Sequence, residues 1–154
     1  MIRPGTPQDA RFLRDMLRHA YYWRSPEESE GGVHAMNYVE NWGRAGDAAL
    51  IAIDQGFPVG AAWYRLFKRD RRGYGFVDEE TPELSIAVVP SRRGAGVGGE
   101  LMKGLLALAH AEGYRAVSLS VAKDSPAVAL YERYGFVRVD ERDGALTMRA
   151  ELTS

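Results

Sequence analysis

Residues 83–112 read ELSIAVVPSRRGAGVGGELMKGLLALAHAE, and three elements follow one another within this stretch. Residues 84–89 form an apolar run rich in β-branched side chains that ends at Pro90, a pattern typical of a buried strand. From Val97 onward the apolar residues recur at helical spacing, and Gly113 stands where a helix commonly ends. The stretch therefore predicts a strand, a glycine-rich turn and a helix in immediate succession.

The predicted turn, residues 92–99, has the sequence RRGAGVGG. Glycine lets the backbone approach a ligand closely, and the first N–H groups of a helix have no partner within the helix. The positive end of the helix dipole and the side chains of Arg92 and Arg93 add positive potential. We therefore interpret this loop as a phosphate-binding site.

The same loop also satisfies the dinucleotide fingerprint G-x-G-x-x-G, through Gly94, Gly96 and Gly99. Residues 90–93 separate the predicted strand from the first glycine, whereas the fingerprint requires a tighter turn. No acidic residue ends the next predicted strand at Val121, and the first half of the chain shows no βαβ alternation. A nicotinamide-dependent enzyme is therefore a weaker alternative.

Two motifs in the second half of the chain together carry a family resemblance. Residues 93–98, RGAGVG, are similar to the signature R/Q-x-x-G-x-G/A, and residues 124–136, DSPAVALYERYGF, are similar to N-x-x-A-x-x-L-Y-E-x-x-G-F. Both are signatures of the GCN5-related N-acetyltransferases (GNAT), and they stand here in that family's order and at about its spacing. Asp124 occupies the position where the family usually has asparagine.

The resemblance implies a single α/β (α+β) domain over residues 1–154, with a mixed, mostly antiparallel sheet flanked by helices. It further implies that two central strands splay apart and admit the pantetheine arm of acetyl-CoA, the expected cofactor. The cofactor-binding residues that it implies are Ile86, Val88, Arg93, Gly94, Ala95, Gly96, Val97, Gly98, Gly99, Asp124 and Tyr131.

The reaction implied by the resemblance is direct transfer of an acetyl group to a primary amine of a small molecule or a peptide. The amide of Val88 is expected to hold the oxyanion, and Tyr131 is expected to donate a hydrogen bond to the departing sulfur. A phenol near pKa 10 and a thiol near 8.5 differ by roughly 2 kcal/mol, so hydrogen bonding is easier here than full proton transfer. The chain has no cysteine, which excludes an acyl-cysteine intermediate.

Four acidic residues, Asp78, Glu79, Glu80 and Glu83, precede or open the predicted central strand. An alkyl amine with a pKa of about 10.4 is mostly protonated at neutral pH and must lose a proton before it attacks a thioester. Glu83 is the expected base because it opens that strand, and Glu79 and Glu80 are second choices. The alternative is that these acids only solubilise a loop.

The expected acceptor is a cationic, partly apolar amine, because aromatic and acidic residues recur in the first half of the chain. The substrate-binding residues that we expect are Tyr22, Trp23, Trp63 and Glu80. The alternative for the aromatic residues is ordinary core packing. A run of basic residues follows, and it is either a solvated loop or a contact for an anionic group; its members are Arg65, Lys68, Arg69, Arg71 and Arg72.

Composition excludes several functional classes. The 154 residues are 45% hydrophobic, enough for one domain with a core, and a net charge of −1 gives no bias toward nucleic acid or an anionic membrane. No apolar stretch approaches the length of a membrane span, so we expect a cytoplasmic protein. The three histidines, His19, His34 and His110, lack metal-ligand spacing, and no metal is expected.

Members of the family often dimerise, so a homodimer is a further expectation. A non-catalytic acyl-CoA-binding regulatory module is the alternative to an enzyme.

Local signals predict the remaining elements. Thr6, Pro7 and Asp9 predict a capped helix start, and a second helix is expected over residues 33–42. Two hairpins are expected, one from residues 48–54 and 58–67 and one from residues 136–140 and 145–152. Residues 115–121 alternate as a strand, and Asp124 or Ser125 is expected to cap a short helix.

Overall fold

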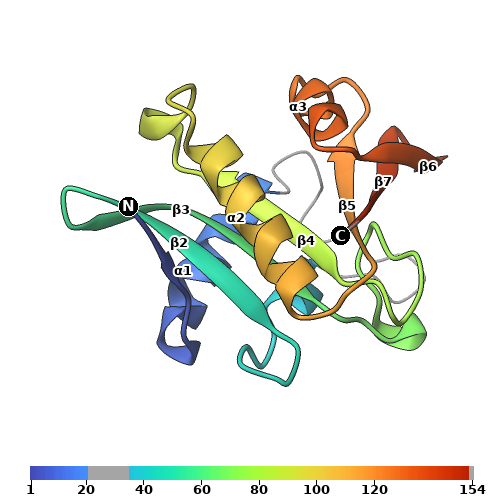
Figure 1. The fold of residues 1–154 in the computed structure, drawn as a ribbon, viewed down its shortest axis with the longest axis horizontal. Helices are drawn as coiled ribbons and strands as arrows, with labels where there is room; N and C mark the ends of the chain where they lie inside the picture. Colours follow the sequence, from blue (N-terminus) through green and yellow to red (C-terminus); the bar gives the residue numbers. More distant parts are fainter. Residues whose placement is uncertain (21–34, 153–154) are drawn as a thin grey trace.

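The computed structural model describes residues 1–20 and 35–152, and it arranges them around one seven-stranded sheet (Figure 1). The strands are β1 (Ile2–Pro4), β2 (Ala48–Asp54), β3 (Phe57–Arg65), β4 (Glu83–Val88), β5 (Ala116–Ala122), β6 (Val137–Arg142) and β7 (Ala145–Glu151). Their spatial order is β1-β2-β3-β4-β5-β7-β6, and every pairing is antiparallel except β4 with β5. The expected mixed, mostly antiparallel sheet is confirmed.

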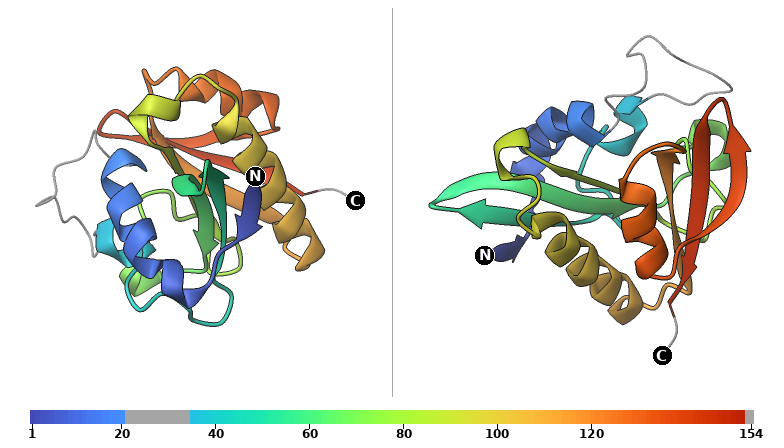
Figure 2. Two further views of the ribbon diagram at one scale, coloured as in Figure 1. Left: turned by 90° about the vertical axis from the view of Figure 1, so that its left-hand side faces the viewer. Right: turned by 90° about the horizontal axis from the view of Figure 1, so that it is seen from above.

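Helices cover both faces of this sheet (Figure 2). The α-helices are α1 (Ala10–Ala20), α2 (Val97–Ala111) and α3 (Ala127–Arg133), and the 3-10 turns are η1 (Pro7–Asp9), η2 (Ala35–Tyr38), η3 (Arg69–Arg71) and η4 (Pro90–Arg92). Because side chains alternate along a strand, β2 sends Leu50 into the core beneath α2 and α3 and Ile51 into the core beneath α1. We call these two sides the α2 face and the α1 face.

The two predicted hairpins form, and their turns explain why. Gln55 and Gly56 have φ values of 51° and 81°, and Asp143 and Gly144 have the same values. Positive φ at both central residues is the requirement of the type I′ turn that matches the twist of paired strands. The predicted capping box also forms, because Thr6 Oγ1 accepts from Gln8 N at 3.2 Å and Asp9 Oδ2 accepts from Thr6 N at 2.7 Å.

The central strands β4 and β5 run parallel but diverge. Their register contains the single pair Glu83 and Ser118, whereas β5 and β7 pair along their whole length. The expected splay of the central strands is therefore confirmed, and Glu83 lies at its vertex.

Two expectations about the first half of the chain are wrong. Within the described part of the predicted helix 33–42, residues 35–38 form only the 3-10 turn η2, and Asn41 and Gly43 then take positive φ values that a helix does not allow. Arg65 is not in a solvated loop; its side chain is 1% exposed and pairs with Asp47 at 2.7 Å. Among the described residues no helix is both long enough and apolar enough to cross a membrane.

Candidate active site

The divergence of β4 from β5 leaves backbone groups of β4 without a strand partner. Val89 N donates to Val59 O at 2.8 Å, so the backbone of Val89 faces β3. Successive residues of a strand point their N–H and C=O groups to opposite sides, which turns Val88 and Ile86 toward the open side. Both residues expected to hold the pantetheine arm thus present their backbone groups to the splay.

A small pocket of about 20 Å³ lies in the splay; we call it the splay pocket. It is lined by Ala20, Leu84, Ser85, Ile86, Leu119, Ser120 and Tyr131. Leu84 and Leu119 belong to the α2 face, whereas Ser120 points to the opposite face because it follows Leu119 in the strand. The lining therefore comes from both faces, with α1 contributing Ala20 and α3 contributing Tyr131.

Tyr131 is almost fully enclosed, with 8% of its surface exposed and its ring against Phe136 at 5.9 Å between centroids. Burial disfavours the phenolate and raises the pKa of Tyr131 to about 12. The side chain is therefore a neutral hydroxyl donor at physiological pH. Sequence reasoning placed Tyr131 on a short helix, and the structure brings it into the splay pocket.

An ultraviolet titration of the tyrosines tests this burial. We expect Tyr131 and Tyr64 to ionise late, because burial also raises the pKa of Tyr64 to about 12. Tyr131→Phe should remove one phenol from the late class, and Tyr64→Phe is the matched control that removes the other. Circular dichroism at each pH checks that the chain is folded. If Tyr131→Phe instead removed one phenol from the class that ionises near pH 10, the hydroxyl of Tyr131 would not be buried.

Glu83 lies beneath a loop rather than in the splay pocket. Its side chain is 1% exposed, and its Oε2 accepts hydrogen bonds from the hydroxyl of Tyr38 and, at 3.0 Å, from Gly75 N. The covering loop contains Gly73 and Gly75 because its backbone lies too close to β4 and β5 for a side chain. A Cβ on Gly73 would stand 2.4 Å from Glu83 Oε1, and one on Gly75 would stand 2.6 Å from the Leu119 carbonyl.

Two serine hydroxyls lead from Glu83 toward the splay pocket. Ser118 lies directly opposite Glu83 in the parallel register, and Ser120 lies two residues further along the same face. Both hydroxyls are buried, and neither has a hydrogen-bond partner among the residues that the structure describes. Buried hydroxyls are normally paired, so these two indicate a place for water or a ligand group.

The glycine loop takes the conformation that its sequence predicts. Gly94 and Gly96 have φ values of 83° and 85°, and Gly96 precedes the first residue of α2 without a side-chain cap. In the described part of the chain, the amides of residues 97–99 have no hydrogen-bond acceptor, as expected at a helix start. Arg93 Nε donates to Val88 O at 3.0 Å, so this side chain joins the loop to the open side of β4.

The two sequence motifs touch each other in space. Tyr134 Oη, at the end of the second motif, donates to Gly99 O at 3.2 Å in the first turn of α2. Of the two residues expected to cap α3, Ser125 makes the bond, accepting from Ala127 N at 3.1 Å, while Asp124 is exposed.

The residues expected to bind the acceptor divide into three groups. Trp63 is 0% exposed and donates from Nε1 to Tyr38 O at 3.1 Å, so it is part of the core beneath α1. Glu80 is exposed in the loop before β4 and lines neither the splay pocket nor the larger cavity that is described next. Tyr22 and Trp23 lie outside the described residues. We therefore do not include Trp63 and Glu80 in the candidate site.

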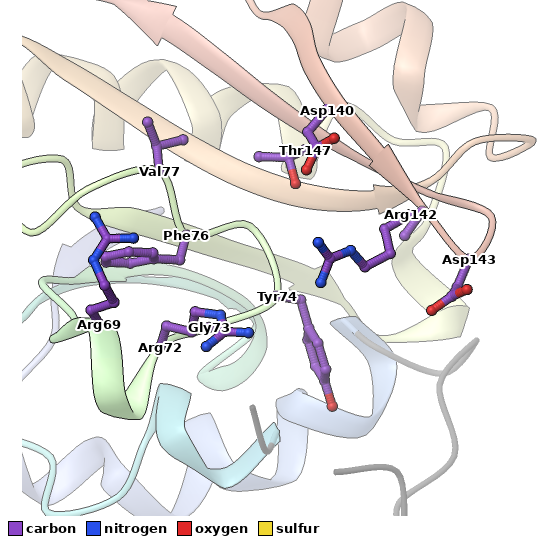
Figure 3. Close-up of a pocket in the computed structure, with 11 residues that line it drawn as sticks. Arg69, Arg72, Gly73, Tyr74, Phe76, Val77, Asp140, Arg142, Asp143 and Thr147 are labelled. Atoms are coloured by element: carbon purple, nitrogen blue, oxygen red, sulfur yellow. The ribbon is translucent and has the colours of Figure 1, made fainter. Parts of the chain in front are cut away.

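A second, larger cavity of about 390 Å³ lies beside Glu83; we call it the arginine cavity (Figure 3). Its lining comes from the loop before β4 and from the β6–β7 hairpin, and comprises Arg69, Arg72, Gly73, Tyr74, Phe76, Val77, Asp140, Arg142, Asp143, Ala145 and Thr147. The hairpin residues of this lining were not among the site residues expected from the sequence. Strand alternation could have placed Thr147 and Arg142 on one face, but nothing local indicates that the 69–77 loop covers them.

Comparisons with known proteins agree with this geometry. A family model described as the acetyltransferase (GNAT) family matches residues 11–136. A ribosomal-protein-alanine N-acetyltransferase from Brucella melitensis is 26% identical with a TM-score of 0.72, and the match covers 99% of this chain and 99% of that chain. No curated protein sequence matches significantly.

Two further solved structures are similar in fold and were solved with acetyl-CoA. The yncA protein from Salmonella typhimurium, with its cofactor acetyl-CoA, is 21% identical with a TM-score of 0.72, and the match covers 99% of this chain and 94% of that chain. A phosphinothricin acetyltransferase from Sinorhizobium meliloti in complex with acetyl-CoA is 20% identical with a TM-score of 0.69. This match covers 99% of this chain and 88% of that chain. At these identities the likeness concerns the fold alone.

Proposed function

Because this chain belongs to the acetyltransferase (GNAT) family, whose model covers residues 11–136, we propose that it transfers the acetyl group of acetyl-CoA directly to a primary amine. The observation that carries this proposal is the splay pocket, whose lining comes from both faces of the sheet and from both diverging strands, β4 and β5. A thioester held along β4 and an amine that approaches from the α1 face would meet at this pocket.

The described residues fit coenzyme A in two stretches. The outward-facing backbone groups of Ile86 and Val88 suit the amides of a pantetheine arm, which would extend the sheet as a strand does. The free amides of residues 97–99 suit the pyrophosphate. Arg93, bonded to Val88 O, stands where the two stretches join.

In the proposed reaction the amine nitrogen attacks the thioester carbonyl, forming the C–N bond, and the C–S bond breaks as the tetrahedral intermediate collapses. The Val88 amide supports the oxyanion, since its N–H faces the splay. Tyr131 donates a hydrogen bond to the leaving sulfur, and its raised pKa, about 12, keeps that proton in place at neutral pH. The proton lost by the amine goes to Glu83.

The burial of Glu83 determines how that proton would travel. The carboxylate is 1% exposed and is covered by residues 73–75, so direct contact with the amine is not available. Ser120 in the splay pocket and Ser118 opposite Glu83 offer a path of hydroxyls, with water between them, toward the carboxylate. We propose that Glu83 acts through this path.

Isothermal titration with acetyl-CoA, coenzyme A and NADH tests the cofactor. We expect micromolar binding of the two coenzyme A species, weakened at least about tenfold by Gly96→Asp, because a carboxylate would face the pyrophosphate at the helix start. Gly96→Asn is the matched control: asparagine has the same shape and tolerates the positive φ of 85°, but it carries no charge. An equal loss of coenzyme A affinity in both variants would assign the effect to the backbone conformation. Binding of NADH without binding of coenzyme A would overturn the proposal.

The burial of Glu83 also favours a second candidate, a non-catalytic acyl-CoA-binding regulatory module. The tight contacts of Glu83 with Tyr38 and Gly75 are equally compatible with a structural carboxylate. Coenzyme A binding together with no acetylation of any amine in a broad panel would favour this second function.

A further inference from the structure

The arginine cavity lies on the face from which an acceptor would approach. Thr147 lies directly opposite Ser120 in the β5–β7 register, and paired residues share a face of the sheet. Asp140 pairs in turn with Thr147, and Arg142 pairs with Ala145, so the hairpin lining is on the α1 face as well. The glycine loop opens α2, which covers the opposite face.

The arginine cavity also adjoins the proposed reaction centre. Gly73 and Tyr74 line it, and Tyr74 N donates to the Tyr38 hydroxyl at 2.7 Å, the same hydroxyl that donates to Glu83. On the other side, Thr147 of the cavity and Ser120 of the splay pocket are cross-strand neighbours. A small molecule in the cavity would therefore lie one cross-strand pair away from the splay pocket.

The charge of the cavity is dominated by arginine. Arg142 directs its guanidinium over the cavity toward Tyr74, whereas Asp143 lies at its edge (Figure 3). Arg69 lies over the ring of Phe76, 5.2 Å from its centroid, which orients the guanidinium. Within residues 1–20 and 35–152, the guanidinium groups of Arg69 and Arg142 have no carboxylate within 4.0 Å, although the backbone N–H of Arg69 donates to Glu79 Oε2 at 2.9 Å.

The two aspartates in the lining offset only part of this positive charge. Asp140 Oδ1 already accepts from Glu141 N at 2.9 Å, and Asp143 sits in the hairpin turn with a φ of 51°. Three guanidinium groups line the cavity against two carboxylates. Guanidinium forks match the paired oxygens of a carboxylate, phosphate or phosphonate, and they offer nothing to an ammonium group.

We infer that the acceptor is a small amine that carries an anionic group, carboxylate or phosphonate-like, and that the arginine cavity binds this group while the amine enters the splay pocket. This inference rests on the proposed acetyl transfer. It modifies the expectation of a cationic, partly apolar amine. The cavity volume of about 390 Å³ suits a small-molecule ligand.

Matched acceptor pairs test the inference by kcat/KM. The probes are ω-amino carboxylates and ω-aminoalkyl phosphonates of increasing chain length, each paired with the carboxamide or alcohol of equal length. We expect the anionic member to be preferred roughly 10- to 100-fold, the range for a charge-assisted hydrogen bond, with the two series telling carboxylate from phosphonate. In Arg142→Gln the ratio of kcat/KM between the anionic and the neutral member should fall close to one.

Arg138→Gln is the matched control. Arg138 lies on the same strand, is exposed and does not line the cavity, because it pairs with Met148 and points to the other face. The preference should be unchanged in this variant. Ligand-observed NMR with the amine-free anions pentanoate and propylphosphonate adds a readout that needs no turnover: binding should be lost in Arg142→Gln and retained in Arg138→Gln.

The outcomes separate this inference from the proposed function. Acetylation of neutral and anionic amines at equal rates, or of peptide N-termini alone, would overturn the anion inference and keep the acetyltransferase. Anion binding that depends on Arg142 without acetylation of any amine would overturn the acetyltransferase and leave an anion site. Equal loss of the preference in both arginine variants would also overturn the inference.

Discussion

Asp47→Ala is expected to destabilise the protein by about 3–5 kcal/mol, because it leaves a buried guanidinium without its counter-ion. Arg65 and Asp47 have side chains that are 1% and 3% exposed, and they are joined by Nε–Oδ1 at 2.9 Å and Nη2–Oδ2 at 2.7 Å. Asp47 Oδ2 also accepts from the amides of Gly43 and Arg44, so the substitution frees two backbone donors as well. A loss of this size is a large part of the stability of an ordinary domain.

Equilibrium unfolding in urea measures the effect of Asp47→Ala, and an exposed ion pair on the same surface provides the control. Arg71 and Glu40 are also 2.7 Å apart, but their side chains are 66% and 45% exposed. Glu40→Ala should therefore change the free energy of unfolding by no more than about 1 kcal/mol. If both variants lost a similar, small amount of unfolding free energy, the Arg65–Asp47 pair would be solvent-exposed in solution rather than buried.

Glu83→Gln is expected to lower kcat/KM by roughly 10²- to 10⁴-fold, the usual contribution of general base catalysis. Glutamine has the same shape, and its amide oxygen still accepts from the Tyr38 hydroxyl and from Gly75 N, so the fold and the affinity for coenzyme A should be preserved. The defect should narrow as the pH rises toward about 10, because the acceptor amine then loses its proton to solvent.

Glu79→Gln is the matched control for the base. Glu79 belongs to the same acidic stretch, but its side chain is 46% exposed and pairs with Lys68 at 4.0 Å. We expect less than about a twofold change in kcat/KM, since an exposed ion pair contributes little. Steady-state kinetics with acetyl-CoA, together with isothermal titration of coenzyme A, would decide between the two carboxylates. Unchanged turnover in the Glu83→Gln protein would remove Glu83 from the mechanism.

The elements that could be predicted from the sequence are those specified within a few residues. The type I′ turn at Gln55 and Gly56 requires residues that tolerate positive φ, and the sequence places them between two strand-like runs. The Thr6 capping box and the strand–loop–helix stretch are equally local. The two GNAT signatures are also local patterns, and this is why the family could be identified before the fold was known.

The parts that could not be predicted depend on pairing between distant segments. Arg65 looked like one member of a charge run because its partner Asp47 is 18 residues away and is brought to it by the β2–β3 register. Trp63 was expected to bind the acceptor, yet the same register places it in the core beneath α1. Propensity carries no information about which face of a strand a distant helix will cover.

The candidate site shows the same division. Residue type and spacing were enough to indicate the glycine loop, Tyr131 and Glu83, because each belongs to a motif or opens a strand. Tertiary structure alone buried Glu83 under Gly75, aligned Ser118 and Ser120 with it, and set Arg142 opposite Arg69. The physical reason is that local backbone preferences act over a few residues, whereas burial and charge pairing depend on which strands the closed sheet brings together.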